Sequence, residues 1–220
     1  MTNQQIKDQI IRRIYSDTRI HPQEIKVEVS EGHIVLTGSV QSISAREAAE
    51  SNTWAVPNVK IVDNRLKVLF PQDYVRPSDD SIVQSLVGLF SVDPDLYLEK
   101  INCSVIDGNI IIQGTVDKLY KKIRAGDIAK NAGGVLNVEN KIVVVPQINS
   151  ADQEIGQSIT DKFFRNASAD VKNISVKVKS GHVTLIGAVP NRASFDFVED
   201  MARYTEGVVD VDNQTIIREA

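Results

Sequence analysis

An α+β fold built from three tandem αββαβ units is predicted for this chain of 220 residues. Three observations predict it. One segment pattern occurs three times along the chain with constant internal spacing. Within each copy, apolar residues first follow the period of a helix and then alternate as in strands. A glycine turn separates the two alternating stretches, as in a β-hairpin.

The three copies align without a gap. The hairpin segment that starts at Ile25 starts again at Ile101 and Ile174. Nine positions are identical in all three copies: those of Ile6, Ile25, Val29, Gly32, Gly38, Val40, Val59, Val62 and Asn64. The later copies hold the corresponding glycines and asparagines at Gly108, Gly114, Asn140, Gly181, Gly187 and Asn213. None of these residues is a catalytic acid, base or nucleophile, so the repeated feature is a fold and not a reaction centre.

The first copy shows each element in turn. Apolar residues at every fourth position from Ile6 to Ile14 indicate an amphipathic helix. Alternation from Ile25 to Val29 indicates a half-buried strand, and Glu31-Gly32 indicates the tight turn to a returning strand that ends at Val40. A second helix follows, and Pro57-Asn58 ends it before a third strand.

Each copy is therefore expected to form a three-stranded mixed sheet with two helices on one face. The predicted domains are residues 1–70, 77–146 and 150–220, joined by short linkers that open with proline. Formal charge is divided unevenly among them, at +1, −2 and −3 in this order.

The composition is that of a folded globular protein. Hydrophobic residues make up 42% and charged residues 25%, and the net charge of −4 disfavours general nucleic-acid binding, which relies on neutralising phosphates. No apolar run is long enough to span a bilayer. The start of the chain lacks the apolar core of a signal peptide, so we expect a cytoplasmic protein, or a periplasmic one if a signal peptide has been removed.

These motifs resemble those of the BON domain, named for bacterial osmotically inducible and nodulation proteins. The resemblance rests on the αββαβ order, on the hairpin pattern from Gly32 to Val40, and on the later Val59, Val62 and Asn64. It covers nearly the whole chain as three tandem domains. The first copy has Pro57-Asn58 where the family usually has a glycine, which we expect to alter the turn there.

We expect no enzymatic activity, no metal and no cofactor. The chain has no glycine-rich phosphate loop, no nucleophile elbow and no zinc-protease helix motif. The single cysteine, Cys103, aligns with Val27 and Val176 on an inward strand position, so it is interpreted as a small buried hydrophobe. The repeated Asn64, in phase with inward residues, is interpreted as satisfying backbone groups, with ligand contact as the alternative.

One set of residues is a candidate contact surface for a membrane or a protein. Trp54 has no aromatic counterpart in the other copies, and tryptophan suits boundaries between apolar and wet surroundings. Four basic residues of the same copy could face an anionic leaflet: Arg46, Lys60, Arg65 and Lys67. The alternatives are core packing for Trp54 and a scattered, solvated face for the charges.

Three functions follow as hypotheses. The first, implied by the resemblance, is a non-enzymatic binding protein that associates with phospholipid membrane surfaces, with anionic phospholipid as the candidate lipid, or with envelope and stress-response proteins. The second is a cytosolic osmotic or ionic stress protein that binds a small ligand or ion between its domains. The third is a structural adaptor.

Overall fold

The structure is a computed structural model that describes residues 1–21, 25–147, 151–165 and 174–218. The helices and strands found within these residues follow the predicted order. They are α1 (Asn3–Ser16), β1 (Ile25–Ser30), β2 (His33–Val40), α2 (Ile43–Trp54), β3 (Ile61–Asn64), β4 (Lys67–Val68), α3 (Asp79–Val92), β5 (Lys100–Ile106), β6 (Asn109–Val116), α4 (Leu119–Lys130), β7 (Asn137–Val144), α5 (Asp152–Arg165), β8 (Ser175–Lys179), β9 (His182–Val189), α6 (Arg192–Arg203) and β10 (Asp210–Ile217).

Each repeat has its own sheet with the returning hairpin strand in the centre. The strand orders are β1-β2-β3, β5-β6-β7 and β8-β9-β10, and β4 continues along the β3 edge of β2. In the first and third repeats the central strand runs antiparallel to the first strand and parallel to the last. The predicted α+β fold with mixed sheets is confirmed.

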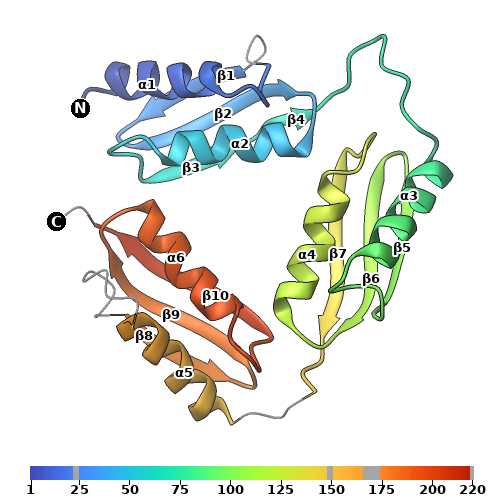
Figure 1. The fold of residues 1–220 in the computed structure, drawn as a ribbon. Helices are drawn as coiled ribbons and strands as arrows, with labels where there is room; N and C mark the ends of the chain where they lie inside the picture. Colours follow the sequence, from blue (N-terminus) through green and yellow to red (C-terminus); the bar gives the residue numbers. More distant parts are fainter. Residues whose placement is uncertain (22–24, 148–150, 166–173, 219–220) are drawn as a thin grey trace. The chain divides into compact units, whose positions relative to one another are not determined.

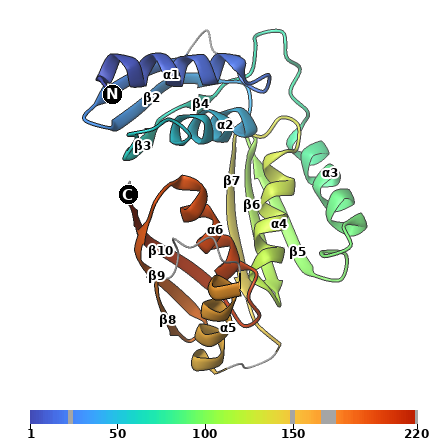
Figure 2. The same ribbon diagram turned by 60° about the vertical axis from the view of Figure 1, so that its left-hand side comes forward.

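Both helices of a repeat lie on one face of its sheet (Figures 1 and 2). The first helix of each repeat buries one apolar stripe, made of Ile6, Ile10 and Ile14, of Ile82, Leu86 and Phe90, and of Ile155, Ile159 and Phe163. Inward strand residues such as Ile34 and Leu36 are fully buried beneath them. Within the described residues, neither helix of a repeat covers the opposite face of its sheet, and alternate strand residues are partly or fully exposed.

The hairpin turns require glycine at their second position for two reasons. Both turn residues have positive φ, for example 50° at Glu31 and 85° at Gly32. In addition, a Cβ on Gly32 would lie 2.7 Å from the carbonyl oxygen of Asn58. The turn therefore packs against the loop that follows the second helix.

We expected Pro57-Asn58 to alter the turn after the second helix, and this expectation was wrong. Asn58 has φ of 67°, close to the 82° and 83° of Gly134 and Gly207 at the same position of the other repeats. Asparagine reaches the left-handed region at lower cost than other residues with a side chain, so this turn keeps its shape without glycine.

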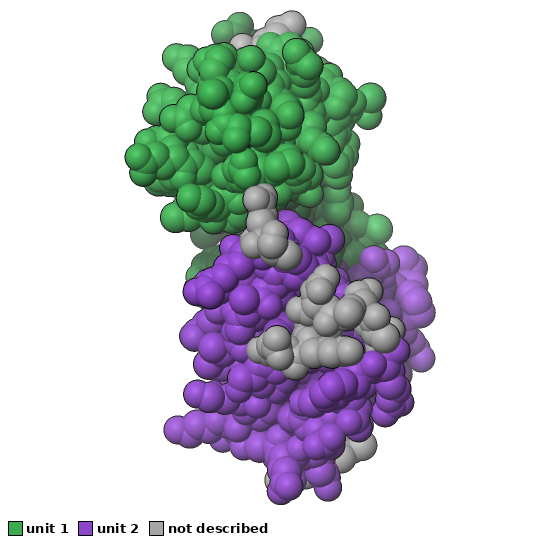
Figure 3. Space-filling model, turned by 90° about the vertical axis from the view of Figure 1, so that its left-hand side faces the viewer, with its two compact units in different colours: residues 1–90, 103–112, 126–139 green, residues 91–102, 113–125, 140–220 purple. Residues whose placement is uncertain are grey.

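The chain divides into two compact units, coloured separately in Figure 3. The first holds residues 1–90, 103–112 and 126–139, and the second holds residues 91–102, 113–125 and 140–220. The first repeat thus lies within the first unit and the third repeat within the second. Two of the expected domain ends, residues 150 and 220, lie outside the described residues.

Candidate functional site

The five predicted contact residues of the first repeat do not form one surface. Arg46 and Trp54 are half-buried and lie two turns apart on α2. Arg65 and Lys67 are exposed, and they alternate with Asn64 and the buried Leu66, which point to the helix side. Arg65 and Lys67 therefore lie on the opposite face of the sheet from α2.

Local pairing further weakens a basic patch. Arg65 Nη2 lies 2.5 Å from Asp63 Oδ2, and this pairing raises the pKa of Arg65 and lowers that of Asp63. The methylene chain of Lys60 lies against Gly32 at the hairpin turn. The first repeat thus presents separate cations on two faces.

The repeated asparagines hold the edge strand to the second helix. The Nδ2 atoms of Asn64, Asn140 and Asn213 donate to the carbonyl oxygens of Arg46, Lys122 and Phe195, at 3.1, 2.7 and 3.1 Å. Their Oδ1 atoms accept the backbone N–H two residues later in each repeat. These N–H groups lie on a sheet edge, so the amide also covers a donor that another strand could otherwise pair with.

A second repeated device was missed from the sequence. Asp79, the first residue of α3, accepts the backbone N–H groups of Asp107 and Gly108 at 2.7 and 3.1 Å. Asp152 does the same for Ser180 and Gly181 at 2.8 and 2.9 Å. The first repeat has Asn3 at this position. Alignment of the copies could have indicated this contact, because an aspartate begins the first helix of both the second and the third copy.

Hydrogen bonds lower the pKa of both carboxylates, and Asp79 also has a charged partner. Arg76 Nη1 lies 2.8 Å from Asp79 Oδ1, and this bond, together with the two N–H groups of the turn, lowers the pKa of Asp79. The N–H groups of Gly181 and Ser180 lower the pKa of Asp152. Both carboxylates are thus held ionised as clamps between the first helix and the hairpin turn.

Cys103 is half-buried on β5, and desolvation raises the pKa of its thiol. At neutral pH we expect Cys103 to react severalfold more slowly with iodoacetamide than a free thiol, since the thiolate is the nucleophile. Replacing it by the valine of the other repeats should change the free energy of unfolding by less than about 1 kcal/mol. Alkylation kinetics and urea denaturation check both statements; alkylation as fast as that of free cysteine would contradict the first.

After Asp80, α3 exposes apolar and polar side chains but no charge, which sequence reasoning overlooked. No charged residue occurs between Ser81 and Val92, whereas the corresponding stretches of α1 and α5 carry several charges. Val87, Leu89 and Val92 are 54%, 42% and 77% exposed. Tyr97 and Leu98, in the loop after the helix, are also exposed. The signal in the sequence was the absence of charge over three helical turns.

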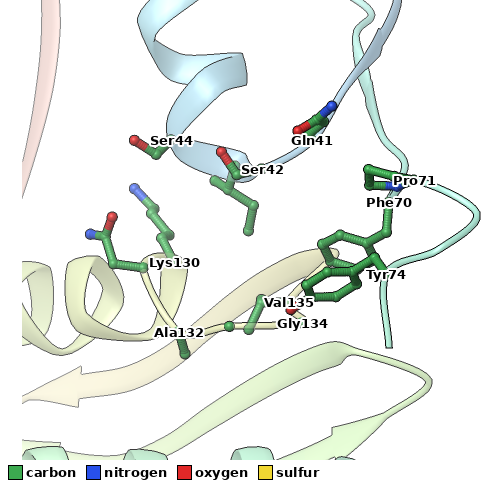
Figure 4. A pocket seen from close by; sticks show the side chains of 13 residues that line it. Gln41, Ser42, Ser44, Phe70, Pro71, Tyr74, Lys130, Ala132, Gly134 and Val135 are labelled. Atoms are coloured by element: carbon green, nitrogen blue, oxygen red, sulfur yellow. The ribbon is translucent and has the colours of Figure 1, made fainter. Parts of the chain in front are cut away.

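The first unit contains a cavity of about 380 Å³ (Figure 4). Its wall includes the rings of Phe70 and Tyr74, which stack with centroids 4.7 Å apart, and the start of α2 at Ser42. Lys130 also lines it, and its Nζ lies 2.8 Å from Glu47 Oε1. The cavity offers an aromatic wall with a neutralised cation, which suits a small uncharged or weakly polar molecule.

Among the described residues, no cluster of histidine, cysteine or carboxylate side chains could hold a metal ion. None of the helices there combines the length and hydropathy that crossing a bilayer requires.

Comparison with known proteins identifies the repeats. The model of the BON domain family matches residues 2–69, 78–146 and 151–219. The chain is 24% identical to a 21 kDa hemolysin of Actinobacillus pleuropneumoniae over 164 residues, which are 71% of this chain and 83% of that protein.

Solved structures give weaker matches. A structure of CdsD, a structural protein of the type III secretion system of Chlamydia trachomatis, aligns over 97% of this chain and 92% of its own, with 16% identity and a TM-score of 0.28. A structure of the C-terminal domain of CdsD aligns over 99% of this chain and 100% of its own, with 15% identity and a TM-score of 0.27.

Proposed function

Because the chain belongs to the BON domain family, with one BON domain in each of its three repeats, we propose that it is a non-enzymatic protein that binds phospholipid membrane surfaces. One observation carries this proposal: after Asp80, α3 exposes Leu89, Val92 and other uncharged side chains and no charged one. A soluble helix normally presents charged residues to water, and an exposed apolar surface marks a contact with lipid or protein. The hemolysin among the relatives points in the same direction.

The energetics suit peripheral binding. Val87, Leu89 and Val92 are about half exposed or more, so moving each into the lipid interface contributes about 1 kcal/mol, since complete burial of such a side chain contributes about 1.5–3 kcal/mol. Leu89 and Val92 lie three residues apart on one side of α3 and can enter the interface together, whereas Val87 points to another side of the helix. We therefore expect weak, reversible adsorption. The contact is apolar, so it does not require an anionic lipid.

Vesicle co-sedimentation of the full chain tests this function. We expect binding to vesicles of phosphatidylcholine alone and to vesicles that also contain phosphatidylglycerol, at both 0.05 and 0.5 M salt. The double variant Leu89→Glu/Val92→Glu should bind at least tenfold more weakly, because two carboxylates would have to enter the interface. Gln9→Glu/Ser16→Glu is the matched control, since it adds the same charge to exposed positions of α1 and should bind normally.

Two outcomes would contradict this assignment. Binding only to anionic vesicles, and only at low salt, would move the contact from α3 to exposed basic side chains, with Arg65 and Lys67 on one face of the first repeat as the first candidates. Failure to sediment with any vesicle would remove membrane binding, and the surface of α3 would then be a site for a protein.

The cavity of the first unit supports a second candidate function, binding of a small metabolite. Its aromatic wall of Phe70 and Tyr74 is the specific observation in favour. A thermal shift screen of uncharged metabolites tests it, since a ligand bound only by the folded state raises the Tm. Tyr74→Ala should abolish any shift that arises in this cavity.

A further inference from the structure

The third repeat sorts its charges by strand on the sheet face opposite the helices. This face carries Ser175, Lys177 and Lys179 from β8, His182, Thr184 and Ile186 from β9, and Asp210, Asp212 and Gln214 from β10. Their neighbours Val183 and Leu185 are buried on the helix side. One edge of the face is therefore basic and the other acidic, with an uncharged or weakly basic strand between them.

The strand register places these charges in matched rows. Lys179 pairs with His182, which pairs with Asp210, and Lys177 pairs with Thr184, which pairs with Asp212. Adjacent strands lie about 4.8 Å apart, so the lysine and aspartate of one row are about 10 Å apart and cannot meet within the sheet. Within the described residues, Lys177, Lys179 and Asp210 have no ion-pair partner. The face therefore carries lysine and aspartate side chains of opposite charge that do not pair with each other within the repeat.

We propose that this face binds the same face of a second copy of the chain. A twofold axis that lies between the two sheets and parallel to β9 would place β8 of each copy over β10 of the other. This rotation does not shift residues along the strand direction, so each row faces the same row of the partner. Lys179 would therefore lie opposite the partner's Asp210, and Lys177 opposite the partner's Asp212. Four ion pairs would form at once, as expected of an isologous contact between identical surfaces. Stacked sheets are about 10 Å apart, which one lysine and one aspartate side chain together span.

The centre of the contact suits the same arrangement. The axis runs along β9, so each copy would bring Thr184 and Ile186 against their own counterparts. Ile186 is 37% exposed and lies in the row of Ser175 and Gln214. The contact would thus place the uncharged Thr184 and Ile186 along the axis, with the charged residues of β8 and β10 on either side.

The first repeat shows that this complementarity is not a property of the fold. On its open face Glu28 pairs with Val35, which pairs with Asp63. The same twofold operation would place Glu28 opposite a second carboxylate and would repel. The first repeat therefore lacks the charge complementarity that the third repeat has.

The size of the face sets the expected affinity. Three strands of five to eight residues cover on the order of 300 Å², which is below the roughly 800 Å² per partner of a standard stable interface. We expect a reversible dimer with a dissociation constant in the micromolar range, weakened by salt.

Sedimentation velocity on the full chain tests the proposal with two charge-reversed variants. Lys177→Glu/Lys179→Glu makes both edges acidic, and Asp210→Lys/Asp212→Lys makes both basic. Each variant alone should dimerise at least tenfold more weakly than the wild type at 0.05 M salt. An equimolar mixture of the two should form a heterodimer, because every row then faces the opposite charge.

The control for net charge is Lys26→Glu/Lys67→Glu, which makes the same charge change on exposed strand positions of the first repeat and should dimerise like the wild type. Circular dichroism verifies that each variant is folded. A wild type that stays monomeric up to several hundred micromolar at low salt would overturn the proposal. Two variants that fail to associate when mixed would overturn it as well. Vesicle binding through α3 does not depend on this result.

Discussion

Replacement of Gly114 by alanine is expected to destabilise the chain by about 3 kcal/mol or more. Gly114 has φ of 141°, and a Cβ there would lie 2.0 Å from the backbone carbonyl oxygen of Lys100 on the neighbouring strand. A strained φ alone costs about 1–3 kcal/mol, and the clash with backbone cannot be relieved by a side-chain rotation. The strands β5 and β6 would have to separate locally. Urea denaturation followed by circular dichroism measures the loss.

Gly88→Ala is the matched control in the same repeat. Gly88 lies inside α3, and a Cβ there would have no atom within 4 Å. Alanine favours the helix and restricts the unfolded chain, so this change should stabilise by about 0.5–1 kcal/mol. A Gly114→Ala variant as stable as the wild type would show that the strands can move apart without cost.

Conversion of Asn64 to aspartate is expected to cost more than the same change at Asn140. Both variants lose the bond from Nδ2 to a carbonyl of the second helix, which should cost about 2 kcal/mol because that carbonyl is left unpaired and faces a carboxylate. Asn64 Nδ2 also lies 3.1 Å from Glu50 Oε2, whereas the second repeat has Gly126 at the place of Glu50. Asn64→Asp therefore adds repulsion between two carboxylates, for a total loss of about 3 kcal/mol.

A double-mutant cycle isolates this difference. Glu50→Gln should recover about 1 kcal/mol in the Asn64→Asp background, because it removes the repulsion. The free energy of unfolding, measured for all four chains of the cycle at pH 7, gives the coupling. Equal losses for Asn64→Asp and Asn140→Asp would mean that Glu50 turns away to solvent and that its contact with the amide contributes nothing.

The repeat pattern allowed the fold to be predicted because the information that specifies it is local. The spacing of Ile6, Ile10 and Ile14 determines which face of a helix is buried, and alternation around Glu31-Gly32 determines a hairpin. Recurrence in three copies separates the positions required by the fold from the rest. The same comparison of the copies predicted that Asn64 satisfies backbone groups. The sequence did not show which ones: the carbonyl of Arg46 and the N–H of Leu66.

The candidate contact surface was predicted less well, because it depends on which side of a sheet each residue takes. Residues Arg46 and Arg65 are close in the sequence, yet α2 and the open sheet face place them on opposite sides. Trp54 drew attention as a rare residue, while the exposed surface of α3 consists of common ones. An unusual residue is easily noticed in a sequence, whereas an absence of charge matters only once exposure is known.

The sequence by itself determined the number of repeats, the order of their elements, the inward faces and the place of Cys103 among the valines of the first strand. Each of these depends on periodicity and on residues near one another along the chain. Only the tertiary structure decided that Gly114 must admit the carbonyl of Lys100, that Asp79 and Asp152 clamp the hairpin turns, and that Lys177 and Lys179 share rows with Asp212 and Asp210. These relations join residues 14 to 35 positions apart, and strand register and helix packing, rather than local spacing, bring them together.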